Sequence, residues 1–113
     1  MNQNVINIES KFACFKDYWS PRVIAELNDY QFKLVKAKGE FVWHTHQETD
    51  EAFIIIDGAL KIEFRDRSID LNPGEMFVVQ KGVEHRPIAK DECKIMLLEP
   101  KNIINIYFNI LEF

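Results

Sequence analysis

The sequence predicts an all-β domain, either a sandwich or a barrel, with a short helical segment before it. Its 113 residues correspond to one domain, because domains typically hold roughly 100 to 200 residues. From about residue 22 onward, short apolar runs are separated by turn residues at intervals of about eight to twelve positions. With 47% apolar and 28% charged residues, the composition is that of an ordinary globular protein.

The two ends of the chain are expected to differ from the strands between them. Residues 10–19 (SKFACFKDYW) predict a short helix with Ser10 as its N-cap and with Phe12 and Phe15 on one face. Residues 101–113 stay undecided, because their isoleucines favour a strand whereas their asparagines recur at helical spacing.

Between the two ends, the apolar runs predict a series of strands. In the clearest one, Leu60, Ile62 and Phe64 alternate with charged residues, so that one face is apolar. The expected strands are residues 23–27, 31–37, 41–46, 52–56, 59–66, 69–71, 76–79 (a buried strand) and 94–98, and a further strand is expected to begin at His85. Turns are expected at residues 28–29, 66–67, 72–75, 81–87 and 89–92.

Charge and cysteine content exclude several classes of partner. The net charge of −4 offers no basic field for a phosphate backbone. Cys14 and Cys93 are far apart, which is typical of reduced thiols in a cytosolic protein. The N-terminus lacks the features of a signal peptide, and no apolar run approaches the ~20 residues of a membrane-spanning helix. We therefore expect a cytoplasmic protein that binds neither nucleic acid nor membranes.

The three histidines are the candidate functional residues. His44 and His46 are two apart, so in a strand both imidazoles share a face. A turn at residues 47–50 would return Glu51 to their side, and His85 begins another expected strand. Three imidazoles and a carboxylate suit a divalent metal such as Zn, Fe, Mn, Ni or Co. With 18 acidic residues in the chain, however, a carboxylate near a histidine also arises by chance, so spacing alone leaves exposed surface histidines equally open.

Two segments resemble the two sequence motifs of the cupin superfamily. The first is GEFVWHTHQETDEAFIIIDG at residues 39–58, and the second is GEMFVVQKGVEHRP at residues 74–87. The matching positions are Gly39, His44, His46, Glu51 and Gly58 in the first segment and Gly74, Gly82 and His85 in the second. The resemblance covers roughly residues 31–99.

Three features depart from the family pattern, and none involves a ligand position. Four residues, where five are usual, separate Gly39 from His44. Gln80 stands where proline is common, and Ala89 stands where asparagine is often found. These departures concern the geometry of turns.

The resemblance implies that residues 1–113 form a small single-domain cupin with an N-terminal extension and a C-terminal tail. It implies an antiparallel jelly-roll β-barrel (double-stranded β-helix) that holds one divalent metal ion. The implied ligands are His44, His46, Glu51 and His85, and Asp50 is the reserve ligand if the register is shifted by one.

Such a ligand set leaves coordination positions open, which is typical of reactive or ligand-binding sites. One hypothesis is a metal-dependent enzyme that acts on a small organic molecule. Its reaction would be that of an isomerase or epimerase, of a lyase or of a dioxygenase, and a sugar-related substrate is included. The alternative is a non-catalytic metal-dependent binding or sensing module, and a metal-free structural barrel is a third reading. No catalytic residue is assigned. The candidates for a general base are Tyr30, Lys33 and Gln80, and those for the apolar pocket wall are Val42, Phe53, Phe64, Phe77 and Met96.

A homodimer is expected from the excess of apolar surface. Phe41 and Trp43 have the parity of the outer face, and further aromatic residues lie in the first twenty positions and in the tail. Either the N-terminal segment or a second subunit could cover Trp43. Exposed edge strands of an open barrel would favour pairing with a second copy.

Overall fold

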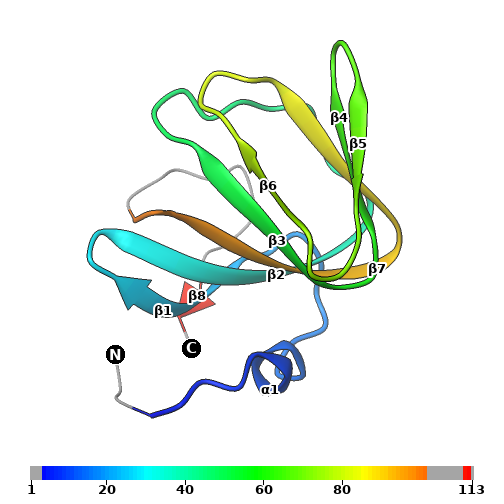
Figure 1. Ribbon diagram of the computed structural model, residues 1–113. Helices are drawn as coiled ribbons and strands as arrows, with labels where there is room; N and C mark the ends of the chain where they lie inside the picture. The colour runs from blue at the N-terminus through cyan, green and yellow to red at the C-terminus, as the bar shows by residue number, and fades with distance from the viewer. Residues whose placement is uncertain (1–3, 102–110, 113) are drawn as a thin grey trace.

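The structure, a computed structural model, describes residues 4–101 and 111–112 and forms an antiparallel β-sheet structure with one short helix in these residues (Figure 1). Its elements are α1 (Ile8–Phe12), β1 (Arg22–Leu27), β2 (Tyr30–Glu40), β3 (Glu51–Asp57), β4 (Leu60–Phe64), β5 (Ser68–Leu71), β6 (Met76–Val79), β7 (His85–Pro100) and β8 (Leu111–Glu112). β8 pairs in parallel with β1. No helix in the described ranges has the length and apolar character needed to cross a bilayer. The expected all-β fold is confirmed.

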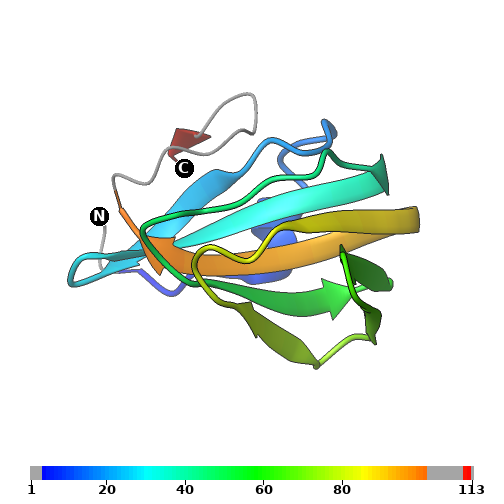
Figure 2. The same ribbon diagram turned by 90° about the horizontal axis from the view of Figure 1, so that it is seen from above.

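The 16-residue strand β7 organises the sheet. β2 pairs with one side of it, from Tyr30↔Pro100 to Glu40↔Ile88. On the other side, β4 pairs with the beginning of β7 and β3 pairs with its end. β5 extends the sheet beyond β4, and β6 extends it beyond β3. The sheet therefore divides on this side of β7 into two parts, β4 with β5 and β3 with β6. The whole sheet curves around a shared interior (Figures 1 and 2).

The turn expected at residues 89–92 is wrong, because β7 continues through it. Ala37 pairs with Cys93, and Gly39 pairs with Ala89. Two steps along β2, from 37 to 39, therefore lie opposite four steps along β7, from 93 to 89. A β-bulge absorbs the extra residues. The charged residues 90–92 are exposed there, and their polarity produced the appearance of a turn.

Alternating side chains fill the interior, as the period of a strand requires. The residues of this core are almost all apolar and almost fully buried: Val35, Ala37, Phe53, Ile55, Leu60, Ile62, Phe64, Leu71, Val79, Ala89, Cys93, Ile95 and Leu97. Burial raises the pKa of the Cys93 thiol to about 12, so this cysteine is a neutral core residue.

The N-terminal segment packs on the outer face of the sheet (Figure 1). Phe12 and Phe15 contact the outward side chains Ile24 and Leu34 in a second buried cluster. The helix was expected to begin at Ser10. It begins earlier because the Asn7 side chain accepts a hydrogen bond from the Ser10 N–H at 2.8 Å and caps it.

Phe41, which was expected on the outer face, instead packs against the interior core together with Trp19. Trp19 stacks on Phe41 with ring centroids 4.9 Å apart. The Arg65 guanidinium lies 3.8 Å from the Trp43 ring centroid, so neither the N-terminal aromatics nor a second subunit is needed there. The homodimer stays a prediction, without support from Trp43.

The strand expected to be buried at residues 76–79 is instead a half-exposed edge. Met76 is 56% and Val78 is 45% exposed, and β6 pairs only with β3 in the described structure. Phe77 and Val79 point inward. Most of the undecided tail, at residues 102–110 and 113, lies outside the described residues, and Leu111–Glu112 form β8.

We predict that Gly58→Ala destabilises the fold more than Gly74→Ala. Both glycines have positive φ, +82° and +84°, which costs an alanine about 1–2 kcal/mol. A Cβ at position 58 would also lie 2.6 Å from the Glu92 carbonyl oxygen of β7, whereas one at position 74 meets nothing within 4 Å. Urea unfolding of both variants measures the difference. Equal losses would contradict the close approach of Gly58 to β7.

Candidate metal centre

The backbone brings His44 and His85 side by side. Each donates its N–H to the carbonyl of the other at 3.0 Å, which forms an isolated antiparallel bridge. The strand expected at residues 41–46 is otherwise absent. This segment connects β2, on one side of β7, to β3, on the other. It is hydrogen-bonded to residues 82–87 only at separate points, which besides the bridge are the Phe41 N–H to the Pro87 carbonyl and the Gly82 N–H to the His46 carbonyl.

Four buried side chains converge inside the fold, and they are the four that the sequence singled out: His44, His46, Glu51 and His85. One potential ligand atom from each lies within 4.8 Å of the other three. Glu51 and His85 are almost fully buried, with 1% and 0% exposure. The grouping is as predicted, and it is consistent with a metal site.

Backbone carbonyls fix the orientation of two imidazoles. Nδ1 of His44 lies 2.9 Å from the Val42 carbonyl oxygen, and Nδ1 of His85 lies 2.9 Å from that of Val83. Because a carbonyl only accepts hydrogen bonds, Nδ1 must carry the proton in each ring. Nε2 is then the ring nitrogen that remains to bind a metal, the arrangement that metal-binding histidines usually have.

The charge states of the cluster differ from residue to residue. Burial lowers the pKa of His44 to about 4, so this imidazole is neutral near pH 7. Burial opposes ionisation of Glu51, but the imidazoles of His46 and His85 more than offset it and hold its pKa below the ordinary value. Burial also disfavours a charged His46, yet the Glu51 carboxylate raises the pKa of His46. The cluster therefore keeps a carboxylate charged in the interior.

Four polar atoms that face one another in this cluster are the two oxygens of Glu51 and Nε2 of His46 and of His85. Nε2 of His46 and of His85 lie 3.5 and 3.8 Å from Glu51 Oε1, which is long for a hydrogen bond. Within the described residues, both Glu51 oxygens and these two nitrogens have no hydrogen-bond partner. Burying such groups unsatisfied costs about 1–3 kcal/mol each, and more for a charge. A divalent cation would satisfy all of them at once, so the residues present fit a metal ion.

Asp50, the reserve ligand, does not join the cluster. Its Oδ1 accepts a hydrogen bond from the Lys81 N–H at 2.8 Å, and the residue is exposed. The register with Glu51 in the site is therefore the one that the structure adopts.

A second buried charged pair lies beside the cluster. Lys33 Nζ donates to Glu99 Oε1 at 2.7 Å, and both side chains are at most 1% exposed. Burial and the neighbouring Glu51 charge raise the pKa of Glu99. Lys33 was a candidate general base, but its ammonium group is held by this ion pair.

Glu99 was not among the residues that we expected in the site. Its parity gave the available signal, because Cys93, Ile95 and Leu97 occupy the alternate inward positions of β7 and Glu99 is the next one. A carboxylate in that register indicates a polar patch in the interior.

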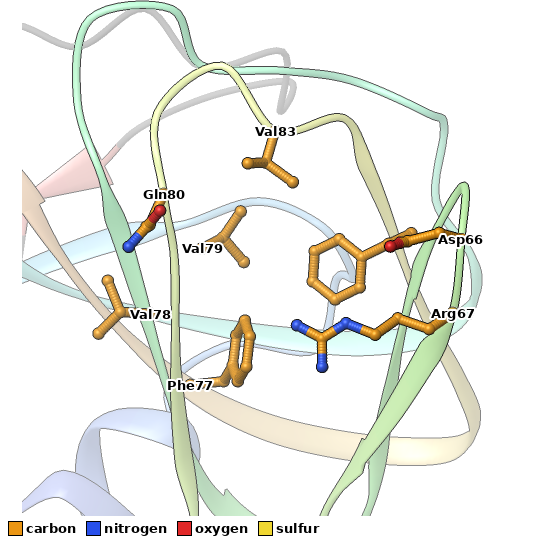
Figure 3. Close-up of a pocket in the computed structure, with 8 residues that line it drawn as sticks. Asp66, Arg67, Phe77, Val78, Val79, Gln80 and Val83 are labelled. Carbon is orange, nitrogen blue, oxygen red and sulfur yellow. The ribbon is translucent and has the colours of Figure 1, made fainter.

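A cavity of about 330 Å³ lies between the β4–β5 hairpin and β6 (Figure 3). Phe64 and Phe77, two of the predicted wall residues, line it, and so does Gln80. Phe53 is in the core, with its ring edge to face with His85. Met96 was wrong as a wall residue, because it has the opposite parity and packs with the outer cluster. Val42, also predicted as a wall residue, is 58% exposed and does not line this cavity. Tyr30, a candidate general base, is 47% exposed and does not line it either.

Comparison with known proteins gives a consistent family assignment. The model of the Cupin domain family matches residues 32–99. A cupin-2 domain containing protein from Shewanella frigidimarina NCIMB 400 is 64% identical, with a TM-score of 0.85 over 86% of this chain and 95% of that one. Protein NMB1881 from Neisseria meningitidis is 35% identical, with a TM-score of 0.79 over 87% of this chain and 100% of that one.

A curated relative is similar over a shorter stretch. The uncharacterized protein YdbB of Bacillus subtilis (strain 168) is 38% identical over 64 residues, which are 56% of this chain. The match spans only 57% of the length of YdbB.

We expect affinity for a divalent ion to fall as the pH decreases through the pKa of His46, which lies above the ordinary value of about 6.5. A proton must leave His46 when the ion binds, so each pH unit below that pKa should weaken binding about tenfold. Protonation of His44, whose pKa is about 4, should not compete with metal binding until the pH is much lower. Calorimetric titration with Zn²⁺ at pH 8, 7 and 6 measures the effect. Equal affinity at pH 8 and pH 6 would show that His46 is not a ligand.

Proposed function

This chain belongs to the cupin domain family, and on that premise we propose that it is a metal-dependent enzyme acting on a small organic molecule. The single observation that carries the proposal is the buried set of three histidines and one glutamate next to a cavity. His44, His46, Glu51 and His85 would hold one divalent ion.

Each part of the site has a role in this proposal. The carbonyls of Val42 and Val83 keep Nε2 of two histidines directed into the cluster, and Glu51 contributes a negative charge in a place that excludes water. A bound ion would supply Lewis acidity toward a carbonyl or hydroxyl group, or, as iron, reactivity with dioxygen. The ligand set suits Zn, Fe, Mn, Ni or Co and does not select among them.

A specific observation favours a second candidate, a binding or sensing module without turnover. Of the eight residues that line the cavity in the described structure, only Asp66 offers a carboxylate that could act as a base, and Asp66 is exposed at the rim. Isomerisation, epimerisation and elimination usually need a positioned base. A dioxygenase reaction at the ion itself depends less on one.

We predict that Glu51→Gln removes most of the bound metal while Asp50→Asn retains it. The wild-type protein should carry about one equivalent of a divalent metal, because the four ligand atoms already converge. Glutamine removes the buried charge at nearly constant volume. Asp50 is the matched control, since it is an adjacent carboxylate that bonds to the Lys81 N–H outside the cluster. Elemental analysis of the three proteins checks this, and full metal content in Glu51→Gln would refute the assigned ligand set.

One kind of experiment, incubation of the metal-loaded protein with candidate compounds, distinguishes catalytic turnover from binding without turnover. The protein, loaded separately with Fe²⁺, Mn²⁺ or Zn²⁺, is mixed with a pool of small metabolites and followed by mass spectrometry. An enzyme should convert many equivalents of one compound, and Glu51→Gln should not. Retention of about one equivalent of an unchanged compound, without conversion of any other, would contradict the enzyme and support the binding module.

A further inference from the structure

The β4–β5 hairpin places Arg67 on the inner face of the sheet. The Phe64 N–H donates to the Arg67 carbonyl at 2.7 Å, so these two residues face each other across a tight Arg65-Asp66 turn. Directly opposed residues of an antiparallel pair share a face. Phe64 belongs to the interior core, and therefore Arg67 also points inward. It occupies the inward series of β5 that Ile69 continues.

The Arg67 guanidinium lies in the cavity (Figure 3). Its carbon is 5.4 Å from the Phe64 ring centroid and 5.8 Å from that of Phe77. No described residue forms an ion pair with Arg67, and Asp66, which also lines the cavity, does not pair with it.

The neighbouring arginines behave differently. Arg65, on the outer face of the same hairpin, pairs with Glu84 at 2.6 Å. Arg86 pairs with Glu63, also at 2.6 Å. The guanidinium in the cavity is thus not matched by a carboxylate as these two are.

The cavity adjoins the candidate metal centre. Phe64, in its wall, is the strand partner of His85, and Val79, also in its wall, is the strand partner of Glu51. Directly opposed side chains have Cβ atoms only about 4.5–5.5 Å apart. A small molecule in the cavity would therefore contact residues that are next to two of the four ligands.

We propose that this cavity binds a small organic monocarboxylate, with its carboxylate on Arg67 and its apolar body among Phe64, Phe77, Val79 and Val83. The inference rests on the proposed function, because it names the substrate class of that site. A guanidinium is always charged, and its planar fork matches a carboxylate. The cavity is at the lower end of the range for ligand sites, roughly 300–1,000 Å³, which suits a small molecule. Asp66 at the rim disfavours a second negative charge, so a monoanion fits better than a dianionic phosphate.

The test uses benzoate as the probe and benzamide as its neutral analogue of the same shape. Amide chemical shifts are followed by NMR during titration of the wild-type protein, Arg67→Met, Arg67→Lys and Arg65→Met. Arg65→Met is the matched control, since it removes a positive charge from the opposite face of the same hairpin. Each titration is done with the protein as purified and again after chelation of metal.

We expect benzoate to shift resonances of the cavity residues and to bind at least about tenfold more weakly to Arg67→Met, the loss typical of a charged hydrogen bond. Arg67→Lys should lose less than Arg67→Met, Arg65→Met should match the wild type, and benzamide should bind more weakly than benzoate. Benzoate affinity unchanged in Arg67→Met, or benzamide binding equal to that of benzoate, would overturn the inference.

The chelated samples separate this inference from the proposed function. Binding that depends on Arg67 both with and without metal supports the inference, even if elemental analysis finds no metal. Binding that requires the metal and ignores Arg67→Met would refute the role of Arg67 and leave the metal centre intact.

Discussion

The interior of this fold contains a buried carboxylate, that of Glu51, whose charge has to be neutralised. An ionised carboxylate with 1% exposure is strongly unfavourable unless positive charge or hydrogen bonds surround it. In this fold the imidazoles around it supply only long contacts of 3.5 and 3.8 Å, and neither Glu51 oxygen has a hydrogen-bond partner in the described residues. A proton on His46 can compensate partly. A divalent ion would compensate fully, and this difference is the physical basis on which we propose a metal centre.

The sheet supplies what this charge arrangement needs. β7 carries His85 at one end and Glu99 at the other, and it pairs with both strands that carry the remaining interior charges, Glu51 on β3 and Lys33 on β2. The Lys33–Glu99 pair brings one charge of each sign, so it leaves the negative charge of Glu51 for the cluster. The register of β7 therefore determines both the geometry and the charge of the interior. The close approach of Gly58 to the β7 backbone at Glu92 belongs to the same register.

The sequence was most informative where strand period and motif spacing coincide. His44, His46, Glu51 and His85 could be grouped because their motifs resemble those of cupins, whereas spacing alone left exposed histidines open. The period of two also assigned Phe64 and Phe77 to the cavity wall, and it would have identified Arg67 and Glu99 had it been applied to charged residues. It failed where long-range pairing overrides local composition: charged residues 90–92 lie within β7 at a bulge, and residues 41–46 cross between strands. Met96 was misplaced because the register of β7 depends on partners distant in sequence.

Anomalous X-ray diffraction from crystals of the metal-loaded protein would show whether these four side chains form one metal centre. We predict a single anomalous peak within about 2.0–2.3 Å of Nε2 of each histidine and of a Glu51 oxygen. The Nδ1 atoms of His44 and His85 should remain on the carbonyls of Val42 and Val83. A metal coordinated through either of these Nδ1 atoms, or one without a contact to Glu51, would show that the four side chains do not form the metal centre proposed here.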